Sequence, residues 1–510
     1  MRVVYRSCYQ FAMIAMMLGS LSACLVGPDF ESPKSPKINH YTKPPWPCRT
    51  ASASGHGGGS QEFIQAKIIS AEWWRLFHSP KINKLICQGI TNSPNLRAAQ
   101  ATLREAQENL SAGIGNGLYP NISAQLTAQR GSNTGFFSGN STNNSITTTS
   151  SGIPSAIFNL FNASLNASYV LDFFGGIRRQ IQGLQSQVEY QYFELRAAYL
   201  SLTANIVTTA ITIASLHRQI CVTKQLIREQ AAQLAIIKKQ FNLGGVSQIE
   251  VVAQQTQLAQ TRATLPPLQK SWAQARHLLA ILVGAFPSEC HIIPSLDLDE
   301  LHLPTELPLS VPSALVRQRP DVRAAEALWG AANAQLGVAT ANLYPQFALT
   351  GSWGRSSSVG SQLFNAQSNL WNIGGGLLQP LFRGGALIAE RRAAIAAYDA
   401  AAAQYREVVL KAFQNVADTL RAIEADAREM RAQKQAESAA YANLYLVKQQ
   451  FFLGGVSYLS LLDAQRQYQQ TRIGSVQAEA SRYADTAALF QALGGGWWNA
   501  NCPVEDHSRA

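Results

Sequence analysis

The residues that could do chemistry in this 510-residue chain form no arrangement typical of an enzyme. The peptide His-Gly-Gly-Gly at 56–59 resembles the oxyanion loop of some esterases, but no Gly-x-Ser-x-Gly nucleophile elbow accompanies it. The His-Glu-x-x-His metal motif, the phosphate-binding P-loop and the Gly-x-Gly-x-x-Gly dinucleotide motif are all absent. No Cys-x-x-Cys occurs, so zinc and thioredoxin chemistry lack support. We therefore expect no catalytic residue, no metal and no cofactor.

One cysteine does lie in a recognisable motif. Residues 1–24 combine a positive start (Arg2, Arg6), an apolar stretch over 11–18 and the peptide Leu-Ser-Ala-Cys at 21–24, which is the order of a secretory signal. The apolar stretch is too short to span a bilayer. The four residues resemble a bacterial lipobox, in which Cys24 becomes the mature N-terminus and carries a covalent lipid. The alternative is an ordinary cleaved signal with a chance cysteine. Leu25 after Cys24 favours the outer membrane.

The other cysteines do not predict a disulfide framework. Cys8 leaves with the signal, and an odd number remains in an oxidising compartment. These are Cys48, Cys87, Cys221, Cys290 and Cys502. At most two disulfides can form, and the sequence leaves their pairing open.

The charge content excludes two classes of protein. Only 14% of the residues are charged, against about 25% in an ordinary soluble chain. The net charge is +11, but lysines and arginines are scattered, so we expect no nucleic-acid partner. A disordered acidic or basic tail is likewise excluded. We assign no partner to the positive charge.

The chain contains an internal duplication. The peptide Leu-Gly-Gly-Val-Ser occurs at 243–247 and again at 453–457. The spacing between these two copies also separates Gln-Thr-Arg at 260–262 from Gln-Thr-Arg at 470–472. Tyr-Pro also occurs twice, at 119–120 and 344–345. Matching peptides that recur in the same order in both halves of the chain indicate a repeated unit. The predicted organisation is a signal peptide (1–23), a lipidated N-terminal linker (24–61), a first repeat (62–290), an inter-repeat linker (291–310), a second repeat (311–496) and a tail (497–510).

Each repeat contains two alternating segments typical of strands. They are expected at about 119–130 and 160–173 in the first repeat, and at about 344–355 and 370–382 in the second. One face is apolar and the other is polar but uncharged, as in transmembrane barrel strands. A soluble β-sandwich is the alternative. The segment 131–152 is nearly all Ser, Thr, Asn and Gly, as expected of an exposed outer loop.

Long helices follow each pair of strands. Residues 177–284 and 386–494 are expected to form them, with a reversal at each Leu-Gly-Gly-Val-Ser turn. The 67 residues from 177 to 243 contain no proline, and as one helix they would measure about 100 Å.

The strands require several chains, because open sheet edges in lipid would leave backbone groups unpaired. Two chains would give eight strands and three would give twelve, and twelve leave room for a lumen. The polar helices must then project into water. The fold class expected is an α+β membrane protein.

Taken in order, several motifs resemble the outer-membrane factor family of TolC/OprM-like exit ducts, in its lipoprotein (NodT-type) branch. They are Cys-Leu-Val-Gly-Pro-Asp-Phe at 24–30, Trp-Trp-Arg-Leu-Phe at 73–77, Arg-Pro-Asp-Val-Arg-Ala-Ala-Glu at 319–326, Gln-Pro-Leu-Phe-Arg-Gly-Gly at 379–385 and both helix turns. The resemblance implies a homotrimer with a twelve-strand outer-membrane β-barrel and a periplasmic helical tunnel. It implies a periplasmic adaptor and an inner-membrane transporter, of RND type, as partners, and it implies no catalysis.

The resemblance also implies functional residues. The helix turns would dock the adaptor's hairpins through Gly244, Gly245, Val246, Ser247, Gly454, Gly455, Val456 and Ser457. The alternative is that these are only favourable turn residues, which explains the glycines but explains the repeated valine and serine less well.

An acidic gate at the tunnel entrance would fall on Asp463, where three copies would form a charged ring. A second acidic position of the family falls on Ser460, and Glu250, its first-repeat counterpart, is the candidate to replace it. The alternative for Asp463 is a solvated helix carboxylate paired with Arg466.

Function is therefore expected to be passive conduction of drugs or other small molecules from the periplasm to the exterior. One alternative is the outer-membrane duct of a type I protein secretion system. Another, outside the class, is a structural coiled-coil envelope lipoprotein, against which the alternating strands argue. The transported substrate and the cognate pump are not encoded in any motif.

Overall fold

The computed structural model describes residues 25–38, 40–42, 48–133, 156–309 and 312–499. The signal segment, Cys24, most of the predicted outer loop, Cys502 and the end of the tail lie outside the described residues. The chain forms two compact units. The first consists of Met1–Glu31, Glu105–Val188 and Leu328–Ala401, and the second of Ser32–Arg104, Glu189–Ala327 and Ala402–Ala510. Each unit therefore takes segments from both repeats.

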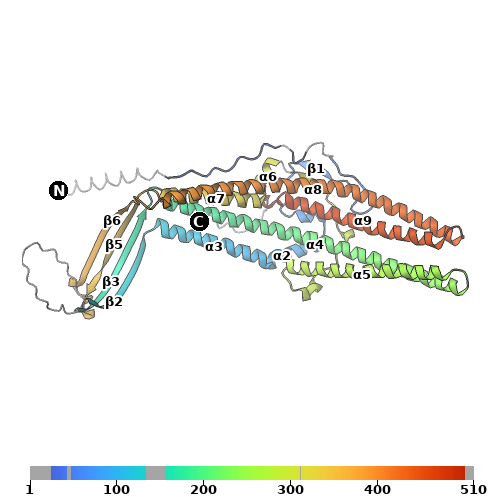
Figure 1. Cartoon of the computed structure of the whole chain (residues 1–510), viewed down its shortest axis with the longest axis horizontal. Helices are drawn as coiled ribbons and strands as arrows, with labels where there is room; N and C mark the ends of the chain where they lie inside the picture. The colour runs from blue at the N-terminus through green and yellow to red at the C-terminus, as the bar shows by residue number, and fades with distance from the viewer. Residues whose placement is uncertain (1–24, 39, 43–47, 134–155, 310–311, 500–510) are drawn as a thin grey trace, which may run out of the picture. The chain divides into compact units, whose positions relative to one another are not determined.

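A four-stranded antiparallel sheet belongs to the first unit (Figure 1). Its strands follow the order β2 (Asn121–Asn133), β3 (Ala156–Leu171), β5 (Gln346–Ser357) and β6 (Asn369–Leu378). All four predicted strands are present, with ends shifted by a few residues. Because β2 extends to Asn133, the start of the segment expected to be an outer loop is strand instead.

The register of the sheet confirms the two predicted faces. One transverse row joins Ala124, Leu165, Trp353 and Trp371, and the neighbouring row joins Ser123, Asn166, Ser352 and Asn372. Apolar and uncharged polar rows alternate because strand side chains have a period of two. The apolar face is open in the single chain, where Ile373 is 81% exposed and Trp371 68%. Such a face is suited to lipid.

The sheet has two unpaired edges, β2 and β6. Long free edges with apolar side chains require a partner strand. Since every pairing within the sheet is antiparallel, β6 of one copy and β2 of the next can continue it in the same sense.

The helices confirm the duplication. The first repeat supplies α3 (Pro94–Leu118), α4 (Gly176–Asn242) and α5 (Gln248–Leu282), and the second supplies α7 (Pro320–Ala341), α8 (Ala386–Phe452) and α9 (Tyr458–Ala492). Helices α4 and α8 each contain 67 residues, and α5 and α9 each contain 35. One window of α4 is apolar enough to cross a membrane, but 61% of it is buried inside the protein, as in a core helix.

Short elements build the core of the second unit. Strand β1 (Glu62–Gln65) pairs in parallel with β4 (Glu306–Leu309). Nearby lie η1 (Trp73–Phe77), α2 (Pro80–Asn92), η2 (Pro287–Ile292), η3 (Leu298–Glu300), α6 (Pro312–Gln318) and η6 (Trp497–Asn499). The ring of Trp73 stacks on Phe490 of α9 with centroids 5.3 Å apart. The segment expected to be an inter-repeat linker thus contains paired strand.

The Gly-rich leader is also tied to this core. The buried guanidinium of Arg482 on α9 donates to the carbonyl oxygens of Gly57 (3.0 Å) and Gly59 (2.6 Å). A Cβ atom at Gly57 would lie 3.2 Å from the ring of Tyr483. The leader's linker-like composition therefore has a structural reason, because glycine allows its backbone to approach α9 closely.

Free thiols are found at Cys48, Cys87 and Cys221, all exposed. None of these three takes part in a disulfide.

Candidate functional site

The two helix turns have nearly the same backbone. Gly244 has φ +74° and Gly454 has φ +76°. The next amides, of Gly245 and Gly455, donate to the carbonyl oxygens of Gln240 (2.8 Å) and Gln450 (2.9 Å). This bond closes a helix with a left-handed glycine, as in the Schellman motif. Glycine is needed at the first position because φ is positive there.

The serines of the turns differ from one another. The hydroxyl of Ser457 accepts a hydrogen bond from the amide of Ser460 and caps α9, whereas Ser247 makes no side-chain cap bond at the start of α5. Capping therefore explains the serine of one turn only. Val246 packs against an apolar cluster formed by Ile237, Val251, Tyr458, Leu461 and Leu462. Packing thus explains the valine of the first turn.

Large apolar side chains are exposed at both turns. Leu243 and Leu453 are each 86% exposed, and the next matched pair, Ile249 and Leu459, are 79% and 63% exposed. Neither turn geometry nor capping requires these side chains to be apolar. Clustered exposed apolar residues are characteristic of interaction surfaces.

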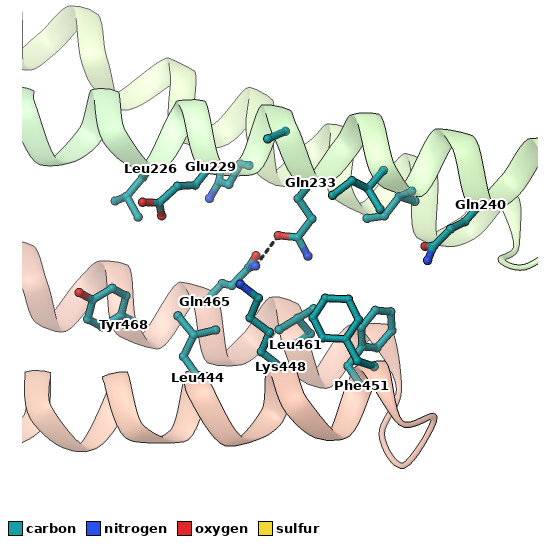
Figure 2. Close-up of a pocket in the computed structure, with 15 residues that line it drawn as sticks. Leu226, Glu229, Gln233, Gln240, Leu444, Lys448, Phe451, Leu461, Gln465 and Tyr468 are labelled. Carbon is teal, nitrogen blue, oxygen red and sulfur yellow. Dashed lines mark hydrogen bonds between the residues drawn. The ribbon is translucent and has the colours of Figure 1, made fainter.

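A groove of about 490 Å³ lies between α4 on one side and α8 and α9 on the other (Figure 2). Its lining includes Ile236 and Ile237 of α4 and Phe451 and Phe452 of α8. The amide of Gln465 donates to the Oε1 atom of Gln233 across it at 2.5 Å, which Figure 2 shows as a dashed line. The groove can therefore hold a side chain or helix face that is largely apolar.

Helix α9 is joined to α5 by two polar contacts. The hydroxyl of Tyr458 donates to Oε1 of Gln254, and Nε of Arg466 donates to Oε1 of Gln257 at 2.5 Å. Burial and the nearby Glu250 carboxylate raise the pKa of Tyr458, so its hydroxyl remains a proton donor at neutral pH. These contacts connect the second helical hairpin to the first close to the turns.

The two predicted gate residues have different surroundings. The side chain of Asp463 is 57% exposed, and its nearest cation is Arg466, with 3.9 Å between Oδ1 and Nη1. Glu250 is half-buried beside Tyr458, and its Oε2 atom has no hydrogen-bond partner among the described residues. Within the described part of the chain, no hydrogen bond or ion pair joins Glu250 to Asp463. Asp463 thus makes the contact with Arg466 named as its alternative, yet remains exposed enough to act on passing ions.

Sequence reasoning missed Tyr458 and Arg466 as contacts between the hairpins. A signal was available in the duplication. Their counterparts at the same offset in the first repeat are Gln248 and Thr256, so both positions depart from the repeat. At these positions α9 has a phenol and a guanidinium, and the groups that accept from them, Gln254 and Gln257, lie on α5.

The residues that follow Cys24 are fixed within the first unit. The amide of Val26 donates to the carbonyl oxygen of Phe174, just beyond the end of β3. The buried Arg179 donates to Gly27 (3.0 Å) and pairs with Asp29 (2.8 Å). The first described residues therefore lie beside the end of β3, a strand of the sheet.

Comparison with known proteins agrees with this geometry. The family model described as outer membrane efflux protein matches residues 85–285 and 311–495, which are the two repeats.

The chain belongs to the outer membrane efflux protein family.

Individual relatives cover almost all of it. The chain is 29% identical over 425 residues to the pyoverdine export outer membrane protein OpmQ of Pseudomonas putida, covering 83% of this chain and 88% of the relative. It is 26% identical over 477 residues to the cation efflux system protein CusC of Escherichia coli K12, covering 94% and 97%. The solved outer-membrane channel OprN superposes with a TM-score of 0.80 at 27% identity, covering 93% of this chain and all of that one.

Membership of the outer membrane efflux protein family establishes the class of function. The chain is a passive outer-membrane efflux channel and not an enzyme. Family channels are trimers, in which four strands from each copy complete a twelve-strand β-barrel that continues into a periplasmic helical tunnel. They act in tripartite efflux with an adaptor protein and an inner-membrane pump. The unpaired edges of β2 and β6 are the strands through which neighbouring copies can pair in such a barrel.

Proposed function

We propose that this channel conducts low-molecular-weight compounds, and that its adaptor docks on the two helix turns and in the groove behind them. The observation that carries the docking proposal is the exposure of Leu243 and Leu453, 86% each, at equivalent positions of the two repeats. A periplasmic adaptor that presents an apolar helical hairpin would bury both. Docking of an amphipathic helix in an apolar groove is a recurring mode of recognition.

The groove strengthens this proposal because it lies beside the same turns. Its apolar residues, such as Ile236 and Phe452, are 54% and 66% exposed, so a helix could cover them. Glu229 and Lys448 also line the groove and could set the orientation of an incoming helix through charge. Together, the turns and the groove form a surface of the kind that binds a hairpin rather than a flat protein face.

The docking proposal is tested with Leu243→Ser and Leu453→Ser in a strain that lacks its own channel. Burying one leucine contributes about 2 kcal/mol, so each substitution is expected to weaken adaptor binding roughly 30-fold. Drug resistance should fall although the trimer still forms, as judged by its heat-modifiable band on gels. Ile68→Ser is the matched control, because Ile68 is 78% exposed but lies far along the chain from either turn. Equal resistance in all strains would contradict the proposal.

We infer that the contacts between α9 and α5 hold the tunnel entrance closed, with Asp463 as a charged ring. The observations that support it are the bonds of Tyr458 to Gln254 and of Arg466 to Gln257. Outward movement of the second hairpin would break both hydrogen bonds. Glu250 would act here through its field on Tyr458 rather than as a member of the ring.

We propose a lipid anchor on Cys24 and a pump of the RND type. The fixed positions of Val26, Gly27 and Asp29 beside the end of β3 would bring the preceding cysteine close to the end of the barrel from which α4 begins.

Export of pyoverdine and of cations, named for the two relatives above, supports small cargo rather than a secreted protein. A proton-driven pump predicts that a protonophore stops efflux through this channel while ATP is still present, and continued efflux would argue against the RND type.

A further inference from the structure

Three side chains distant in the sequence meet beside α9. His56 belongs to the leader, Asp299 to η3 and Glu479 to α9, and one ligand atom from each lies within 4.8 Å of the other two. The Nδ1 atom of His56 and the Oε1 atom of Glu479 are 3.3 Å apart. Because the histidine and the glutamate are 423 positions apart, no sequence motif indicates this group.

The carboxylate of Glu479 is buried, and the basic side chain beside it is that of His56. The residue is 7% exposed, and within the described part of the chain no lysine or arginine forms an ion pair with it. Lys434 lies near enough to act on its charge, but the ion pair of Lys434 is with Glu437, at 3.6 Å. A buried carboxylate that forms no ion pair with lysine or arginine is costly, so this position favours binding of a positive charge.

The loop that carries His56 is held in place before any ligand binds. Arg482 binds the carbonyl oxygens on both sides of Gly58, and the amide of Ala53 donates to the carbonyl oxygen of Gly58 at 2.8 Å. Asp299 forms an ion pair with Arg218. Outer contacts of this kind orient metal ligands and reduce the entropy lost on binding.

We propose that His56, Asp299 and Glu479 form a binding site for a divalent transition cation such as Zn²⁺. Two ligands bound tetrahedrally at about 2.0–2.1 Å from zinc lie roughly 3.3 Å apart, which matches the distance between His56 and Glu479. Asp299 is exposed on a three-residue helical turn, and a movement of up to about 1.5 Å brings it to the same spacing. Water would take the fourth position.

The bound cation would join the leader to η3 and α9. It would cross-link three segments that are otherwise held by hydrogen bonds, and so stabilise the folded leader. This role is separate from conduction, which depends on the barrel and the tunnel.

The test uses the purified, tag-free, full-length trimer in detergent. Titration with Zn²⁺ by calorimetry, and with Co²⁺ by visible absorption, should show one site per chain with the strong absorption of tetrahedral Co²⁺. His56→Ala and Glu479→Gln should each weaken binding at least about tenfold. His277→Ala is the control, because His277 is an exposed histidine of α5 outside the group, and it should bind as the unmodified protein does.

Thermal unfolding gives a second readout, in which the Tm of each protein is compared with and without Zn²⁺. Zn²⁺ should raise the Tm of the unmodified protein and of His277→Ala, and leave that of His56→Ala unchanged. Absence of binding at millimolar Zn²⁺, or equal binding in His56→Ala, Glu479→Gln and the control, would overturn the proposal. None of these outcomes affects the docking or gating proposals, because neither involves this group.

Discussion

Two aspartates of the second helical hairpin show how differently one residue type behaves when it is exposed and when it is half-buried. Asp463 on α9 is largely exposed and lies near Arg466. Asp426 on α8 is half-buried, and its carboxyl group interacts with that of Asp485 on α9. The first can act on ions in solution, whereas the second is part of the contact between two helices.

For Asp463, removal of the charge is expected to change conduction. In the trimer, Asp463→Ala deletes three negative charges from the proposed ring, so conductance should rise or cation selectivity should fall, by roughly twofold. Planar-bilayer recordings measure both quantities. Asp463→Glu, which keeps the charge, is the control. Unchanged conductance and selectivity in Asp463→Ala would rule out the gate assignment.

For Asp426, the pKa predicts a dependence of stability on pH. Burial, the interaction with the carboxyl group of Asp485 and the charge of Glu429 raise its pKa to about 7, and Arg482 opposes them. A carboxyl group whose pKa is raised in the folded state stabilises that state while protonated, and the contribution is lost as pH rises through about 7. The channel should therefore be less stable at pH 8 than at pH 5.

Asp426→Asn tests this directly. The amide keeps a hydrogen-bonding group next to Asp485 but carries no charge, so the difference in Tm between pH 5 and pH 8 should shrink. Since solvent reaches the half-buried pair, we expect an effect of only about 1 kcal/mol. Asp418→Asn, an exposed change on the same helix, should leave the pH dependence intact. An identical pH dependence in Asp426→Asn would show that the pair does not control it.

At the scale of elements, the strands show the clearest difference in polarity between two faces. Asn372 and Ile373 are neighbours in β6, and they lie on the polar and the apolar face of the sheet respectively. Because successive side chains of a strand point to opposite faces, one of the two meets lipid and the other meets the lumen.

Lysine at these two positions should therefore have unequal effects. On the lipid face a lysine costs about 2–4 kcal/mol near the membrane midplane, so Ile373→Lys should lower the amount of trimer in outer-membrane fractions. Asn372→Lys should form normal amounts of trimer and reduce cation conductance. Gels of unheated samples and bilayer recordings separate the outcomes. Equal trimer yields would mean that the two faces are not divided between lipid and water.

At the scale of the whole molecule, we expect insertion to depend on strands from three chains and not on the lipid proposed for Cys24. Cys24→Ser should abolish labelling by radioactive palmitate, yet leave a heat-modifiable trimer in the outer membrane. A lipid chain adds a surface anchor, whereas the strands satisfy their backbone groups only by closing the barrel. If the unmodified protein takes up no palmitate, the lipobox interpretation is wrong. Loss of the trimer in Cys24→Ser would instead make the lipid necessary for assembly.

Local patterns in the sequence were enough to determine the duplication, the strand faces and the helix turns. The alternation around Leu165 and the glycine at 244 are effects of neighbouring residues, because strand period and positive φ depend on local backbone geometry. The family resemblance follows from the same local motifs taken in order.

Tertiary structure alone decided which distant side chains meet. Tyr458 reaches Gln254 only because helices from both repeats pack together. Arg482 reaches the leader, and His56 reaches Glu479, only because the leader packs against α9. A contact of this kind depends on the packing of whole helices, and no spacing along the chain encodes it. The sequence therefore determined what each segment becomes, and the packing decided which residues act together.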